Sequence, residues 1–215
     1  HWMEQGGLYA VCGVRGGGEY GEHWHRSGSG EHKLNTIRDV EACAQFFLHN
    51  NYCTRQSLAL FGRSNGAMVM AAVVNRDPTL YQAAILVAGL YDMLNFHRYT
   101  IGKIWQGEYG NSEDPIDKAR LEALSPLHNI QAGQIYPHIM VCTGRDDDRV
   151  PPLHSYQLVK ALQEKTQKPS VILNLYDKTG HGAGRSTSQT VAEHADILSF
   201  AMAAVGLGES SLSSR

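Results

Sequence analysis

Apolar runs of strand length alternate with amphipathic segments along most of the chain. Short continuous apolar runs are typical of strands buried in a parallel sheet, and apolar positions spaced three and four residues apart are typical of helices. The pattern predicts strands at residues 7–14, 57–61, 83–88, 139–143 and 171–176. It predicts helices at residues 36–50, 67–76, 153–165 and 188–205. Strands that alternate with helices predict an α/β fold, with a mostly parallel sheet and helices on both faces.

Two segments interrupt this alternation. Residues 20–35 are polar and rich in glycine, so we predict a loop that ends where Thr36 caps the following helix. Residues 89–136 contain no strong strand pattern, and Pro115 and Pro126 divide them into short helices and loops. A long excursion of this kind in an α/β protein often shapes a binding site.

The composition is that of an ordinary globular protein. The chain has 215 residues, of which 42% are hydrophobic and 19% are charged, enough for one domain with a sizeable core. We therefore assign residues 1–207 to one domain and residues 208–215 to a flexible tail. The chain begins His-Trp-Met-Glu, unlike a signal peptide or a usual start. We expect the true N-terminus to be missing.

Charge and cysteine content exclude several classes of function. The net charge of −2 gives no basic surface for nucleic acid or anionic membrane, and no apolar stretch approaches the length of a transmembrane span. Four scattered cysteines lack metal-binding spacing and fit a reducing compartment, so we expect a cytoplasmic protein. His23 and His25 have no further ligands spaced nearby, so we expect no metal and no cofactor.

The segment 57–76 carries the first candidate for chemistry. A short apolar run leads into Gly62-Arg63-Ser64-Asn65-Gly66, and a helical segment rich in Ala and Met follows. Strand, Gly-x-Ser-x-Gly turn and helix is the context of a nucleophile elbow, although the same pattern also arises as a plain strand-to-helix turn. We expect side chains at 62 and 66 to collide with the strand and helix, and the Asn65 N–H to face a developing oxyanion.

Two later loops supply a candidate acid and base. Residues 144–151 include Asp146, Asp147 and Asp148, and His181 lies between glycines directly after the last predicted strand. The order Ser, Asp, His is that of α/β-hydrolases, in which a histidine activates the serine and a carboxylate orients the histidine. Three consecutive aspartates are equally consistent with a solvated turn. The chemistry alone does not select one of them.

Seven blocks of sequence carry more specific motifs. They lie at residues 15–21, 64–66, 92–102, 105–110, 125–129, 147–155 and 180–184. Together, and in this order from about Gly6 to Leu207, they resemble the catalytic domain of the prolyl oligopeptidase family of serine peptidases. The resemblance implies an α/β-hydrolase fold, incomplete at its N-terminal side, and cleavage of short peptides after proline. It also implies a β-propeller in the full-length protein, of which this sequence shows nothing.

The resemblance also assigns roles to individual residues. It implies Ser64 as nucleophile, His181 as general base and then acid, and Asp147, three residues before Val150, as the catalytic acid partner. The Asn65 N–H would be one oxyanion donor. The remaining roles concern the substrate: Trp105 stacks on its proline ring, Tyr109, Val150 and Leu90 close that pocket, and Arg149 binds a backbone carbonyl upstream.

Three alternatives stay open beside this assignment. Oligopeptidase B, a relative that cleaves after Arg or Lys, can carry Arg at the position of Arg63, although Asn65, Trp105 and Tyr109 favour the proline-specific branch. A non-catalytic fragment or binding module would follow from the missing propeller and a missing second oxyanion donor. Esterase or lipase activity is the weakest, because Trp105 and Arg149 suit a peptide better than an acyl chain.

Overall fold

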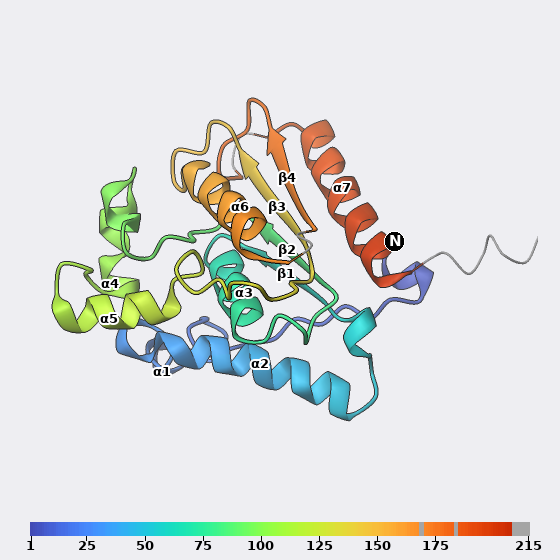
Figure 1. The fold of residues 1–215 in the computed structure, drawn as a ribbon, viewed down its shortest axis with the longest axis horizontal. Helices are drawn as coiled ribbons and strands as arrows, with labels where there is room; N and C mark the ends of the chain where they lie inside the picture. Colours follow the sequence, from blue (N-terminus) through green and yellow to red (C-terminus); the bar gives the residue numbers. More distant parts are fainter. Residues whose placement is uncertain (168–169, 183–184, 208–215) are drawn as a thin grey trace, which may run out of the picture.

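The computed structural model describes residues 1–167, 170–182 and 185–207. Among them, the strands β1 (Ala59–Arg63), β2 (Ala83–Val87), β3 (His138–Gly144) and β4 (Val171–Tyr176) form one sheet in the order β1-β2-β3-β4 (Figure 1). All neighbouring pairs are parallel. The carboxyl ends of the strands therefore share one edge. The predicted tail at 208–215 lies outside the described residues.

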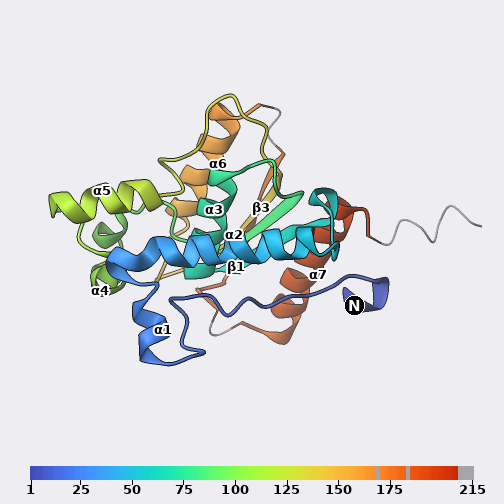
Figure 2. The same cartoon turned by 90° about the horizontal axis from the view of Figure 1, so that it is seen from below.

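Helices cover both faces of this sheet. On one face α3 (Asn65–Arg76) and α6 (Leu153–Lys165) pack on the strands, and α2 (Lys33–His49) crosses α3, as Figure 2 shows. On the other face lies α7 (Thr187–Val205). Side chains of β2 alternate accordingly, with Leu86 in the core under α3 and Val87 in the smaller core under α7. Burial on both faces explains why β2 is apolar throughout. The α/β-hydrolase fold class is confirmed.

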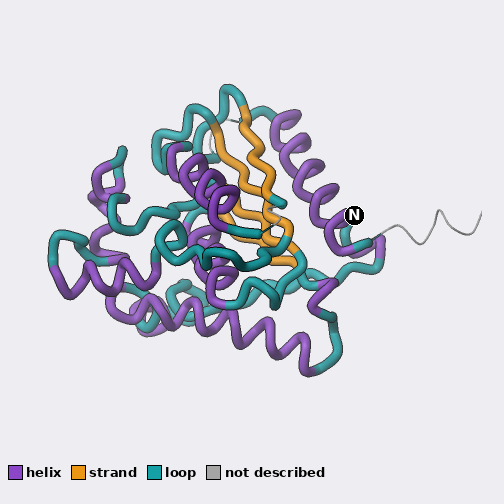
Figure 3. Tube along the Cα trace, in the orientation of Figure 1, coloured by secondary structure: helices purple, strands orange, loops and turns teal. Residues whose placement is uncertain are grey.

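The excursion between β2 and β3 contains helices but no strand in the described part of the chain. It holds α4 (Gln106–Tyr109) and α5 (Pro115–Leu124), which Figure 3 shows joined by loops. The Asp114 side chain accepts from the backbone N–H groups of Ile116 and Asp117, and Pro115 occupies the first turn of α5, so the local sequence begins this helix. A short helix, α1 (Glu22–Arg26), lies near the start of the chain. Shorter helical turns are Met3–Gln5, Gly30–His32, Arg55–Ser57, Phe96–Arg98 and Gly102–Trp105.

The predicted strand at residues 7–14 is wrong. This segment forms no regular element, and Leu8, Tyr9 and Val11 are exposed. An apolar run becomes a strand only where another strand pairs with it, and β1 pairs with β2 alone among the described residues. The local apolar pattern was therefore insufficient to predict a paired strand.

The predicted boundary at Thr36 is also wrong. Helix α2 begins at Lys33, and α1 lies within the predicted loop. Thr36 is buried one turn inside α2, where its hydroxyl lies 2.7 Å from the Arg15 carbonyl oxygen and 3.0 Å from that of Gly28. The hydroxyl thus ties the preceding loop to the helix and caps nothing.

Candidate active site

The turn between β1 and α3 holds Ser64 in an unusual backbone conformation. Its φ of 55° and ψ of −121° lie where residues other than glycine are rare. A Cβ at position 62 would overlap the Gly66 carbonyl, whereas a Cβ at position 66 would meet open space. The tight turn therefore requires glycine at 62 only, which corrects the expectation for Gly66. The Ser64 N–H donates to the Val87 carbonyl at 2.8 Å, which fixes the turn to β2.

His181 lies between the hydroxyl of Ser64 and the carboxylate of Asp147. Its Nε2 is 2.9 Å from Ser64 Oγ, and its Nδ1 is 2.8 Å from Asp147 Oδ2. An ionised carboxylate only accepts hydrogen bonds, so Nδ1 carries the proton and Nε2 accepts from the serine hydroxyl. This is the arrangement in which an imidazole can remove the hydroxyl proton.

The carboxylate of Asp147 has no exposed surface and is fully hydrogen-bonded. Its second oxygen, Oδ1, accepts from the backbone N–H groups of Arg149 at 3.0 Å and Val150 at 2.9 Å. Three donors thus satisfy a buried carboxylate and hold its orientation. Asp146 and Asp148 are exposed at the surface of the same loop. Of the three aspartates, Asp147 is the one that contacts His181.

Asn65 begins α3 directly after the serine. The first N–H groups of a helix have no acceptor within the helix, and the helix dipole gives this end a partial positive charge. The Asn65 side chain is held separately, because its Oδ1 accepts from the Tyr109 hydroxyl at 2.9 Å. A backbone N–H next to Ser64 is therefore available for an oxyanion in a turn that Tyr109 braces.

The apolar residues expected around a proline ring lie in one packed cluster. Leu90, Tyr109 and Val150 are buried in the core on the α3 side of the sheet, and Trp105 is partly buried against it. Burial raises the pKa of Tyr109 well above its ordinary value, so its hydroxyl stays a donor. Arg149 is exposed beside this cluster, in the loop of Asp147. All the residues predicted for the site thus lie near the carboxyl edge of the sheet or the excursion after β2.

Glu193, which the sequence reasoning missed, is buried behind the elbow. It lies on α7, and it pairs with Arg63 of the elbow and with Arg185 of the loop that carries His181. A signal for it exists in the sequence, because Glu193 has the four-residue spacing of Ile197 and Ala201, the other buried residues of α7. A charge on the apolar face of a helix indicates a partner inside the fold.

Two kinds of site find no support in the described residues. Over the ranges that the structure describes, no three His, Cys, Asp or Glu side chains come together in a way that could hold a metal ion. No helix in those same ranges has both the length and the apolar character needed to cross a bilayer.

Comparison with known proteins places the chain among peptidases. The model of the prolyl oligopeptidase family matches residues 1–208. A prolyl endopeptidase of Elizabethkingia meningoseptica is 42% identical over 208 residues, which are 96% of this chain and 30% of that protein. A prolyl endopeptidase of Dictyostelium discoideum is 40% identical over 199 residues, covering 90% of this chain and 26% of its own. The chain thus spans less than a third of the length of these curated relatives.

Solved structures agree with this placement. One from a study of two prolyl endopeptidases superimposes with a TM-score of 0.93 at 33% identity, covering 96% of this chain and 31% of that one. Oligopeptidase B from Leishmania major superimposes with a TM-score of 0.85 at 28% identity, covering 90% of this chain and 27% of its own. Structures of a prolyl endopeptidase and of an oligopeptidase B therefore both share this backbone.

Proposed function

Because this chain belongs to the prolyl oligopeptidase family, we propose that its protein hydrolyses short peptides on the carboxyl side of proline through an acyl-enzyme. The observation that carries the proposal is the hydrogen-bonded series Ser64–His181–Asp147, at 2.9 and 2.8 Å, on the carboxyl edge of the sheet. The sequence match to peptidases agrees with it, and the peptide class follows from relatives named prolyl endopeptidase.

The reaction proceeds in two halves. Ser64 Oγ attacks the carbonyl carbon after proline while His181 Nε2 takes the hydroxyl proton, and the oxyanion of the tetrahedral intermediate accepts from the Asn65 N–H. His181 then gives the proton to the leaving amine, and an ester of Ser64 remains. Water attacks this ester with His181 again as base, which frees the carboxylate product and restores the serine. Asp147 holds the imidazole tautomer throughout.

The proline preference is assigned to the apolar cluster. A proline ring is flat, apolar and lacks an N–H, so a pocket walled by Trp105, Tyr109, Val150 and Leu90 selects it without a charge. Arg149, which is exposed beside the pocket, donates to a substrate carbonyl further upstream. We also assign the protein to the cytoplasm, since all four cysteines are free thiols, and expect a β-propeller domain elsewhere in the full-length protein.

Cleavage after Arg or Lys is the second candidate, and one contact counts against it. Arg63 was the residue that favoured it, but its guanidinium pairs with the buried Glu193 of α7. The elbow arginine thus has a structural partner inside the fold. Its presence does not require a basic substrate.

Labelling and turnover test the proposal together. A fluorophosphonate probe should label the full-length protein, and Ser64→Ala should abolish labelling while Ser57→Ala, an exposed serine before β1, leaves it unchanged. Succinyl-Gly-Pro and benzoyl-Arg chromogenic substrates then separate the two branches. Labelling that persists in Ser64→Ala, or faster cleavage of the Arg substrate, would overturn the assignment. Turnover by the 215-residue chain alone would dismiss the view that it is an inactive module.

A further inference from the structure

A buried carboxylate on α7 lies behind the reacting groups. The side chain of Glu193 is 1% exposed, and it shares the buried face of its helix with Ile197 and Ala201. Burying an ionised carboxylate is unfavourable unless cations and hydrogen bonds replace its lost hydration. Glu193 therefore marks a place where the fold brings charges together inside its core.

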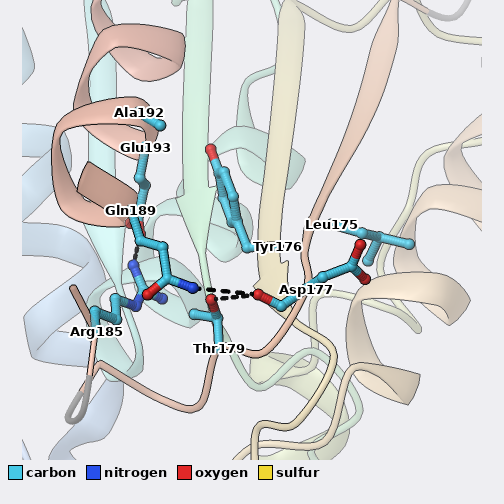
Figure 4. Close-up of a pocket in the computed structure, with 8 residues that line it drawn as sticks. All are labelled: Leu175, Tyr176, Asp177, Thr179, Arg185, Gln189, Ala192 and Glu193. Carbon is cyan, nitrogen blue, oxygen red and sulfur yellow. Dashed lines mark hydrogen bonds and ion pairs between the residues drawn. The ribbon is translucent and has the colours of Figure 1, made fainter. Parts of the chain in front are cut away.

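Its two partners are both next to the proposed reacting residues. Glu193 Oε1 pairs with Arg63 Nη2, and Arg63 directly precedes Ser64. Glu193 Oε2 pairs with Nη1 of Arg185. The Nη2 atom of the same guanidinium lies 3.5 Å from the carbonyl oxygen of Gly180. Figure 4 shows Arg185 extending toward Glu193 at the edge of a hollow between α7 and the loop after β4. Since Gly180 directly precedes His181, one carboxylate connects the neighbours of nucleophile and base.

The loop that carries His181 has a second attachment to α7. In Figure 4, Gln189 points toward Asp177, and its Nε2 lies 3.5 Å from the carbonyl oxygens of Asp177 and Lys178. These contacts hold the start of the loop only. Glu193, through Arg185, holds the part next to the imidazole.

The charges around this cluster balance when Glu193 is ionised. Burial lowers the pKa of Arg63 and of Arg185, and the charge of Arg63 lowers that of Arg185 further. Asp147 acts on both guanidinium groups from the loop after β3 and raises the pKa of each. The two guanidinium groups are thus balanced in charge by the carboxylates of Asp147 and Glu193.

Two other titratable groups that face the cluster, a thiol and a phenol, are neutral. Cys142 of β3 and Tyr176 of β4 both have a pKa that burial raises, to about 11 for Cys142. Asp196 of α7 faces Tyr176, with its Oδ2 3.1 Å from the tyrosine hydroxyl. Among the carboxylates of the described residues, Glu193 is the one that pairs with both arginines.

We propose that Glu193 is a positioning residue for the peptidase reaction: by holding Arg63 and Arg185 it fixes His181 at hydrogen-bonding distance from Ser64. The inference rests on the proposed function. Arg63 connects Glu193 to the turn of Ser64, and Arg185 connects it to the loop of His181. Glu193 itself touches no reacting atom.

Glu193→Gln tests the link, because it keeps the volume of the side chain and removes its charge. We expect kcat on a succinyl-Gly-Pro substrate to fall about ten- to hundredfold with KM unchanged, since small misplacements of a base are costly. The two arginines then lack their carboxylate and disfavour the imidazolium of His181. The acid limb of kcat/KM should move to lower pH by about half a pH unit or more. A purely structural role would lower the melting temperature without moving this limb.

Controls isolate the effect. Asp196→Asn removes an exposed acid from the same helix, three positions on from Glu193, and should leave kcat and the acid limb unchanged. Arg63→Gln breaks the link from the elbow, and the double variant with Glu193→Gln should lose less than the product of the two single losses. If Glu193→Gln does not fold, Arg63→Gln tests the link by its fall in kcat, and its acid limb should move to higher pH because a cation is removed.

The outcomes separate the two proposals. Absence of proline-directed turnover in the wild type, with fluorophosphonate labelling absent too, overturns the proposed function. Normal wild-type turnover with an unmoved acid limb and unchanged kcat per labelled site in Glu193→Gln overturns the positioning role. Strictly multiplicative losses in the double variant also overturn it, because they mean that Glu193 does not act through Arg63.

Discussion

His154 should make the protein lose stability in mild acid. It lies in the first turn of α6 with 1% of its surface exposed, and its Nδ1 accepts from the backbone N–H groups of Tyr91 at 3.4 Å and Asp92 at 3.3 Å. The ring also packs edge-on against Tyr99, with centroids 5.5 Å apart. Burial lowers the pKa of His154 to about 4, and the charge of Asp92 opposes this only in part. The folded protein therefore holds this imidazole neutral.

The size of the effect follows from proton linkage. An unfolded chain binds a proton at this histidine below about pH 6.5, whereas the folded chain does so only below about pH 4. Between these values unfolding takes up a proton, so the free energy of unfolding falls as the pH falls. Each pH unit in this window is worth about 1.4 kcal/mol, which gives a total of about 3 kcal/mol. The contribution is fully present near pH 7 and lost near pH 4.

Urea unfolding of the wild type and of His154→Gln measures this contribution. Midpoints and slopes would be compared at about pH 7, about pH 5.5 and about pH 4.5. The difference in the free energy of unfolding between the two proteins should shrink toward acid, because the variant has no buried imidazole to protonate. His49→Gln, at the exposed end of α2, controls for the loss of a surface histidine. Parallel pH dependence in wild type and His154→Gln would refute the reasoning.

Three further predictions follow from other contacts. Gly62→Ala should prevent folding of the elbow, because its Cβ overlaps the Gly66 carbonyl. Gly66→Ala, whose Cβ meets open space, should melt within a few degrees of the wild type. Equal melting temperatures for the two variants would contradict this prediction. Burial raises the pKa of Cys12 to about 12, so peptide mapping at about pH 8 should find it alkylated at least ~100-fold more slowly than free cysteine, with the rate rising as the pH rises. Lys33→Met should cost about 2–3 kcal/mol in urea unfolding, less than a fully buried pair, because it removes the buried ammonium 2.7 Å from Glu108 and leaves that partly exposed carboxylate with the His25 ring at 3.1 Å; a loss below ~0.5 kcal/mol would show that the pair contributes little.

Sequence alone determined the elements whose cause is local. The boundaries of α6 and β4 match the predicted residues 153–165 and 171–176, because helical and strand periodicity are written in neighbouring side chains. The turn at Ser64 was predictable for the same reason, since strand, glycine and helix adjoin one another. The segment at residues 7–14 shows where this fails: its apolar pattern is that of a strand, but a strand exists only with a partner, which the local sequence cannot supply.

The tertiary structure decided which distant side chains meet. The hydroxyl of Ser64 and the imidazole of His181 are 117 residues apart in sequence and 2.9 Å apart in space. The chemistry of three consecutive aspartates left their roles open, whereas the loop geometry buries Asp147 beside the imidazole and exposes the other two. Glu193 and the Tyr109 hydroxyl gained their partners in the same way. Such contacts depend on how strands and helices pack across the whole domain, and no short segment contains that information.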